Sequence, residues 1–65
     1  MEGSELRAIR EEMGLTQVQF AELLGLTSQT ISDLERGKMR VTQTVEKLAV
    51  AKKALWYIKK WVDTS

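Results

Sequence analysis

Three glycines divide the first part of the chain into short segments. Gly14, Gly25 and Gly37 each follow a run of residues with helical spacing. Glycine readily adopts the left-handed backbone with which many helices end. The chain has no proline, and neither glycine nor proline interrupts a longer periodic stretch over 42–62. The sequence therefore predicts an all-α fold of three short helices followed by a long one.

Capping residues set the expected helix boundaries. Ser4 is the predicted N-cap of the first helix, and Thr16 with Gln19 has the capping-box pattern for the second. Thr27 is the predicted N-cap of the third helix. The expected helices cover residues 4–13, 17–24, 28–36 and 42–62.

The last predicted helix is too apolar to cover only one small core. Its apolar residues form two lines at helical spacing, Leu48, Ala51, Leu55, Ile58 and Val62 in one and Val50, Ala54, Tyr57 and Trp61 in the other. A domain of 65 residues buries only about 60% of its unfolded surface, so association is a plausible source of added stability. We expect one domain overall, with the short helices over 1–41 forming most of its core and a helix over 42–65 that completes the core. The expected dimer interface comprises Leu55, Ile58, Trp61 and Val62.

The residue types that are missing exclude several classes of function. The chain has no cysteine and no histidine, which removes disulfides, thiolate zinc sites and the usual general base. No catalytic constellation, metal site or small-molecule site can be drawn, so we expect no enzyme activity and no cofactor. No apolar run approaches the 18 residues of a membrane span, and no signal peptide is apparent. The expectation is a soluble, cytoplasmic protein.

Charge is divided unevenly along the chain. Residues 1–35 carry seven acidic and two basic side chains, whereas residues 36–65 carry eight basic and two acidic ones. The resulting net charges of −5 and +6 indicate a polyanion or an acidic protein surface as partner. The alternative is that these charges only keep a small domain soluble.

The third predicted helix has few apolar residues. Ile31 and Leu34 are its only strongly apolar residues, whereas Gln29, Ser32 and Asp33 lie on another side. Such a helix is suited to presenting small hydrogen-bonding groups to a partner. A solvated surface helix is the alternative, but it normally carries long Glu and Lys side chains.

The segment over 17–36 has the spacing of a helix-turn-helix, with Ala21 at the helix crossing and Gly25 in the turn. Residues 6–38 resemble the lambda-repressor-like (Cro/cI, XRE) family of DNA-binding domains, including small regulators of phages and mobile elements. The family's fold has four to five helices, with a central helix-turn-helix. After Gly37 the match fades, because Lys52-Lys53-Ala54-Leu55 lacks the usual breaker before a fifth helix. The matching segments are Leu6-Arg7-x-x-Arg10, GLTQ (14–17), FAELLGLT (20–27) and QTISDLERGK (29–38).

The resemblance implies that the third helix lies in the major groove of double-stranded DNA. Gln29 can pair bidentately with adenine, and Asp33 can accept from the N4 amine of cytosine. Arg10 and Glu35 match an ion pair that fixes the third helix against the first. The implied base-reading residues are Ser28, Gln29, Thr30, Ser32 and Asp33. The implied DNA-backbone contacts are Gln17, Thr27, Arg36, Lys38 and Arg40.

The expected function is a homodimeric transcriptional repressor, with residues 1–41 as its helix-turn-helix DNA-binding core, that reads an inverted-repeat operator. Its small size suggests that it controls its own operon. One alternative is a protein-interaction module or antitoxin-like component that binds a partner through the same helices. Another is a membrane-surface helix, because Trp56, Tyr57 and Trp61 alternate with lysines. We favour DNA binding and expect no membrane partner.

Overall fold

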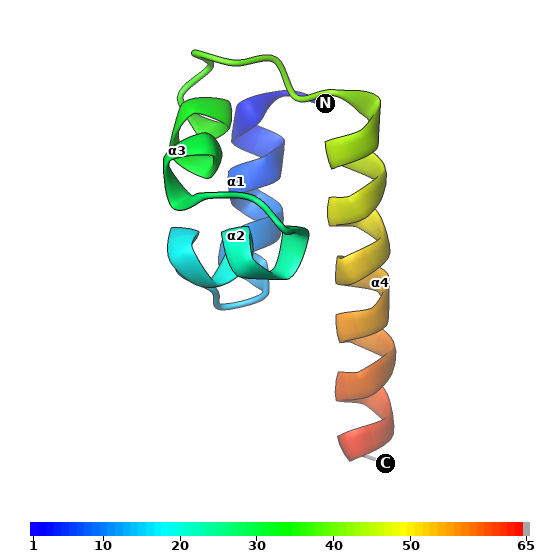
Figure 1. Cartoon of the computed structure of the whole chain (residues 1–65). Coiled ribbons are helices and arrows are strands. Elements are labelled where there is room, and N and C mark those ends of the chain that lie inside the picture. The colour runs from blue at the N-terminus through cyan, green and yellow to red at the C-terminus, as the bar shows by residue number, and fades with distance from the viewer. Residues whose placement is uncertain (65) are drawn as a thin grey trace.

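The computed structural model describes residues 1–64, which form four helices, and Ser65 at the end of the predicted segment 42–65 lies outside them. The predicted all-α class is confirmed within this range. In Figure 1, α1, α2 and α3 form a compact group, α4 lies beside it, and the C-terminal half of α4 extends away from it. Contacts of α1 and α2 with α4 join the two parts, and α1 and α2 also contact α3 within the group. The helices are α1 Gly3–Glu12, α2 Gln17–Leu24, α3 Ser28–Glu35 and α4 Gln43–Thr64.

The N-caps of α2 and α3 are those that the sequence predicts. The Gln19 backbone N–H donates to Thr16 Oγ1 at 3.1 Å, and Gln19 Oε1 accepts from the Thr16 backbone at 2.9 Å. The Thr30 backbone N–H donates to Thr27 Oγ1 at 3.2 Å. These bonds satisfy backbone donors that have no partner within the first helical turn.

The predicted N-cap of α1 is wrong. The helix begins at Gly3 with Glu2 as its N-cap, and the Glu5 carboxylate accepts from the Glu2 backbone N–H at 3.3 Å. Ser4 is exposed within the first turn. The first residue of α1, Gly3, lies against the C-terminal end of α3. The helix thus makes a contact with α3 at its very start.

Gly3 of α1 lies against the backbone at the C-terminal end of α3. A Cβ atom at this residue would overlap the carbonyl oxygen of Leu34 and lie 3.0 Å from that of Glu35. Neither oxygen belongs to a flexible side chain. Relief of the overlap would require the two helices to separate.

Gly3→Ala is therefore expected to lower the free energy of unfolding, although alanine favours helix by about 1 kcal/mol. Overpacking of this kind costs about 1–3 kcal/mol, so we expect a net loss. Urea unfolding followed by circular dichroism measures it. Ser4→Ala is the matched control and should leave stability unchanged or slightly higher, whereas loss of a true N-cap would cost about 1 kcal/mol. A more stable Gly3→Ala protein would contradict the close approach.

The core lies between all four helices, and among the α4 residues whose burial is described only one is fully buried. Ala49 faces the core, with Val45 and Trp56 partly buried beside it on the same side of α4. Both Leu48 and Leu55, from the first predicted apolar line, are exposed instead. The buried set is Leu6, Ile9, Met13, Phe20, Ala21, Leu24, Ile31, Leu34, Val41 and Ala49.

A polar cluster attaches α4 to the end of α1. Lys53 Nζ lies 2.8 Å from Glu12 Oε2, and the Tyr57 hydroxyl donates to Glu12 Oε1. Hydrogen bonds from Lys53 and Tyr57 lower the pKa of the Glu12 carboxyl below its ordinary value. Contact with Glu12 also raises the pKa values of Lys53 and Tyr57. Glu12 thus faces α4.

The last part of the chain forms one helix, α4, rather than the two that a breaker near residues 52–55 would give. Among the described residues, no helix is both long enough and apolar enough to span a membrane.

Candidate nucleic-acid interface

Helix α3 is held to the core by one side and presents the start of the helix to solvent. Ile31 and Leu34 are buried against α1 and α2, whereas Ser28 and Gln29 are exposed. Ser32 and Asp33 are half-buried. The predicted base-reading residues thus share one helix, with Ser28 and Gln29 the more accessible.

Thr27 and Thr30 have a local role at the start of α3. Their hydroxyl oxygens are 2.9 Å apart and share a hydrogen bond, in addition to the bond between the Thr30 backbone and Thr27 Oγ1. Thr27 is exposed and Thr30 is half-buried. The pair fixes the first turn of α3.

Gln29 and Asp33 lie one turn apart on α3 and are joined directly. Gln29 Nε2 donates to Asp33 Oδ1 at 3.0 Å. Two residues that the sequence treats as separate contacts with bases therefore form one unit.

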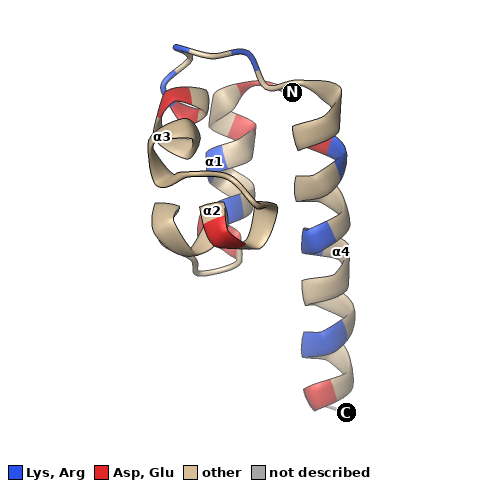
Figure 2. Ribbon diagram, in the orientation of Figure 1, with Lys and Arg blue, Asp and Glu red and all other residues tan. Residues whose placement is uncertain are grey.

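Basic side chains surround the exit of α3. Arg36 caps the C-terminal end of the helix, and Lys38 and Arg40 follow in the loop before α4. All three side chains are exposed, and Figure 2 shows positive charge along this loop, beside the end of α3.

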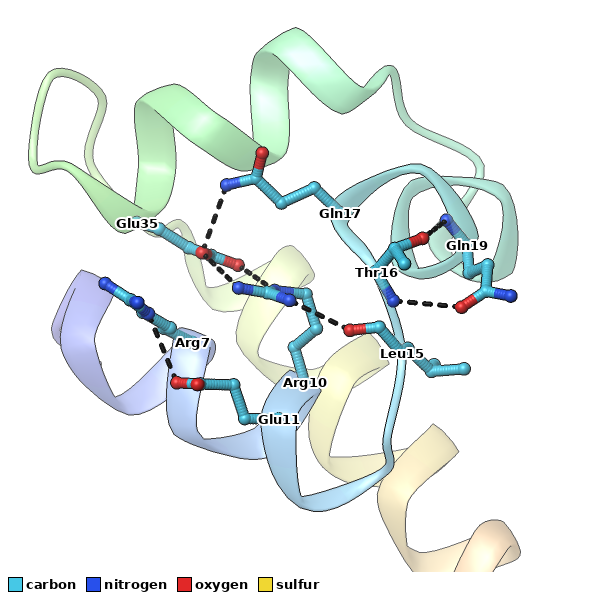
Figure 3. A network of polar contacts seen from close by, with 8 residues as sticks. All are labelled: Arg7, Arg10, Glu11, Leu15, Thr16, Gln17, Gln19 and Glu35. Carbon is cyan, nitrogen blue, oxygen red and sulfur yellow. Dashed lines mark hydrogen bonds and ion pairs between the residues drawn. The ribbon is translucent and has the colours of Figure 1, made fainter.

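A buried ion pair sets the position of α3 relative to α1. Arg10 Nε lies 2.7 Å from Glu35 Oε2, and Arg10 Nη2 lies 3.1 Å from Glu35 Oε1 (Figure 3). The Arg10 side chain is 13% exposed and the Glu35 side chain 4%. Arg10 Nη1 also donates to the carbonyl of Leu15 at 2.8 Å, and the hydrogen bond with Glu35 raises the pKa of Arg10.

Gln17 extends the same network to the first turn of α2. Its Nε2 donates to Glu35 Oε1 at 3.3 Å, and its side chain is half-buried (Figure 3). The resemblance assigns Gln17 to the DNA backbone but gives no indication of this contact. Residues 17 and 35 are far apart in sequence, and neither has a local pattern that predicts the pairing.

The turn between α2 and α3 has the geometry that a compact helix-turn-helix needs. Gly25 has a φ of 73° in the left-handed region, and the Leu26 backbone N–H donates to the Ala21 carbonyl at 2.8 Å. Ala21 is buried where the two helices meet. A family model described as "Helix-turn-helix" matches residues 6–51.

The chain belongs to the lambda-repressor-like helix-turn-helix family. Its α3 is the second helix of the helix-turn-helix, which in such folds enters the major groove. The family match ends within α4, so the half of that helix after residue 51 lies outside it.

Two curated relatives support the membership. The chain is 45% identical over 53 residues to the HTH-type transcriptional repressor RghR of Bacillus subtilis (strain 168), a match covering 78% of this chain and 39% of the relative. It is 52% identical over 33 residues to an uncharacterized HTH-type transcriptional regulator of Methanothermobacter thermautotrophicus, covering 51% of this chain and 48% of the relative. The matches thus span less than half of each relative's length. No solved structure matches the chain.

Proposed function

We propose that this helix-turn-helix protein is a sequence-specific regulator of transcription that reads double-stranded DNA with α3. The observation that carries the proposal is the exposed start of α3, where Ser28 and Gln29 project from a helix fixed by buried Ile31 and Leu34. Side chains of this type form hydrogen bonds with base edges in the major groove. Thr30 and Ser32 are proposed to contact bases beside them, and Asp33 belongs to the same base-reading set through its hydrogen bond to Gln29.

The proposed contacts with the DNA backbone flank this helix. Arg36, Lys38 and Arg40 supply exposed positive charge at its exit. Gln17 and Thr27 lie at the starts of α2 and α3, where backbone N–H groups favour phosphate oxygens. Basic contacts of this kind add affinity for any sequence and fix the register of the protein on the duplex.

Gln29→Ala and Lys38→Ala are expected to have different effects on binding. Gln29→Ala should weaken binding to the preferred site by about 1–3 kcal/mol and relax the preference at one base pair in each half-site. Lys38→Ala should weaken binding to all duplexes alike and reduce its dependence on salt. Fluorescence anisotropy with specific and random duplexes at several salt concentrations measures both. Equal losses on specific and random DNA for Gln29→Ala would contradict its role in base reading.

We further propose that the protein binds as a homodimer through the distal half of α4. Leu55, Ile58, Trp61 and Val62 are 60%, 61%, 72% and 59% exposed. Leu55 also borders a shallow apolar groove between α2 and α4, lined in part by Met13, Leu15, Leu23 and Trp56. An exposed apolar surface of this kind is typical of a protein-protein interface. In this proposal residues 1–41 form the DNA-binding core and residues 42–65 complete it and form the interface.

The proposal is tested by selecting binding sites from random duplex DNA with the intact protein. We expect enrichment of an inverted repeat whose half-sites are about one helical turn apart, as two-fold symmetry requires. Folded protein that enriches no sequence would contradict DNA reading and favour a protein partner for the same helices. Enrichment of a single half-site would contradict the dimer alone.

A repressor role is proposed because one relative is named as a repressor. With the selected site placed across a promoter in a reporter plasmid, expression of the protein is expected to lower reporter output. The same plasmid with a scrambled site is the control. Higher output from the intact site would contradict repression.

A further inference from the structure

We infer that Asp33 is a positioning residue that fixes the amide of Gln29 for adenine, rather than a direct contact with a base. The inference rests on the proposed function and on the hydrogen bond of 3.0 Å between Gln29 Nε2 and Asp33 Oδ1. Asp33 is half-buried, whereas Gln29 is exposed. The outer member of the pair is therefore the one available to DNA.

The chemistry of the two groups determines which way the amide faces. An ionised carboxylate only accepts hydrogen bonds, so Asp33 selects the nitrogen of the Gln29 amide and excludes its oxygen. One N–H of Gln29 is used in this bond. When this is the N–H that points away from the amide oxygen, the second N–H lies beside the oxygen, and that edge keeps one donor next to one acceptor.

That remaining pattern distinguishes the two purines. Adenine offers an acceptor at N7 and a donor at N6, which match a donor beside an acceptor. Guanine offers two acceptors, N7 and O6, so the Gln29 oxygen would face another oxygen. A glutamine with its oxygen held inward would present two N–H groups instead and would suit guanine.

The position of the pair on the helix favours this role. Residues at i and i+4 lie on one helix face, and glutamine with aspartate at this spacing forms a stabilising hydrogen bond. Ile31 lies between Gln29 and Asp33 in the sequence, and Leu34 follows Asp33. Both apolar side chains are buried and fix the helix that carries the pair. The Gln29 amide is thus oriented before DNA arrives, which reduces the ordering cost of reading the base.

Asp33→Asn is the direct test, because asparagine can donate as well as accept and so permits the amide of Gln29 to turn over. The base pair that Gln29 reads is located first, as the position where Gln29→Ala relaxes preference. At that pair we expect the unaltered protein to prefer adenine over guanine by about tenfold. Asp33→Asn should reduce the preference to about threefold or less, with affinity for the adenine site within about threefold of the original.

Asp33→Ala is the second variant, and it should also lose the preference because nothing then orients the amide. Thermal unfolding of each variant, followed by circular dichroism, verifies that the protein is folded. A preference for guanine at the Gln29 position in the unaltered protein would overturn the inference. So would an unchanged preference for adenine in both folded Asp33 variants.

A double mutant separates positioning from direct reading. In the Gln29→Ala background, Asp33→Asn should leave base preference at every position unchanged, because Asp33 acts through Gln29. If Asp33 instead accepts from cytosine N4, its substitution would alter preference at a neighbouring pair in either background, which overturns the inference. Absence of any enriched sequence with the unaltered protein would contradict the proposed function itself, so the two failures are distinguishable.

Discussion

Arg10→Ala is expected to lower the free energy of unfolding by about 3–5 kcal/mol, the usual cost of removing one partner from a buried ion pair. The Glu35 side chain, only 4% exposed, would lose the guanidinium that pairs with it, and Gln17 would be its remaining side-chain donor among the described contacts. The carbonyl of Leu15 would also lose its donor. For a domain of this size the loss is comparable with the whole stability, which is about 3–10 kcal/mol.

Arg7→Ala provides the matched control, because Arg7 forms the other arginine–glutamate pair of α1. Arg7 Nε lies 3.2 Å from Glu11 Oε1, but both side chains are more than half exposed. Exposed pairs of this kind contribute about 1 kcal/mol or less. Urea unfolding of both variants measures the difference. Similar losses for Arg7→Ala and Arg10→Ala would contradict a stabilising role that depends on burial.

Ile58→Lys is expected to convert the proposed dimer into a monomer. Ile58 is 61% exposed in the single chain, and full burial of a side chain of this size contributes about 1.5–3 kcal/mol. A lysine in each copy would remove this apolar contribution from both sides of the interface and place two like charges there. Sedimentation equilibrium should therefore give the mass of one chain. Affinity for the inverted repeat should fall while affinity for an isolated half-site is retained.

Val50→Lys is the control for the dimer prediction. Val50 is also exposed on α4, at 51%, but it lies in the proximal half and outside the proposed interface. It receives the same change of chemistry and should leave the mass in solution unchanged. A dimer that persists in Ile58→Lys would contradict the assignment of this surface.

The sequence predicts the short helices well because their signals are local. Thr16 with Gln19, and Thr27, mark helix starts through bonds that span only three residues. The backbone φ of 73° at Gly25 is likewise a property of one residue and its turn. Local rules of this kind determine α2 and α3 almost to the residue.

The orientation of α4 could not be derived in the same way. Leu48 and Leu55 lie in the more regular apolar line, yet the core receives Ala49 and Trp56. The helix is apolar on more than one side, so periodicity alone cannot tell which side meets the rest of the chain. The fit of α4 against α1 and α2 makes that choice.

The polar contacts between helices also lack a signal in the sequence. Glu12 adds to the negative charge of residues 1–35, but it pairs with Lys53 and Tyr57 on α4. Gln17 faces Glu35 for a similar reason, since folding brings the start of α2 beside the end of α3. The Arg10–Glu35 pair is predicted only by the family resemblance.

The separation of α3 from the distal half of α4 has a consequence for how such regulators diversify. In Figure 1 α3 and the distal half of α4 lie in different parts of the molecule. Changes at distant sites without shared neighbours combine additively. With the roles proposed above for Gln29 and Ile58, a duplicated gene could therefore alter its operator preference and its pairing preference in either order. Neither change depends on the other. Two related regulators in one cell could therefore come to bind separate operators and to pair only with their own copies.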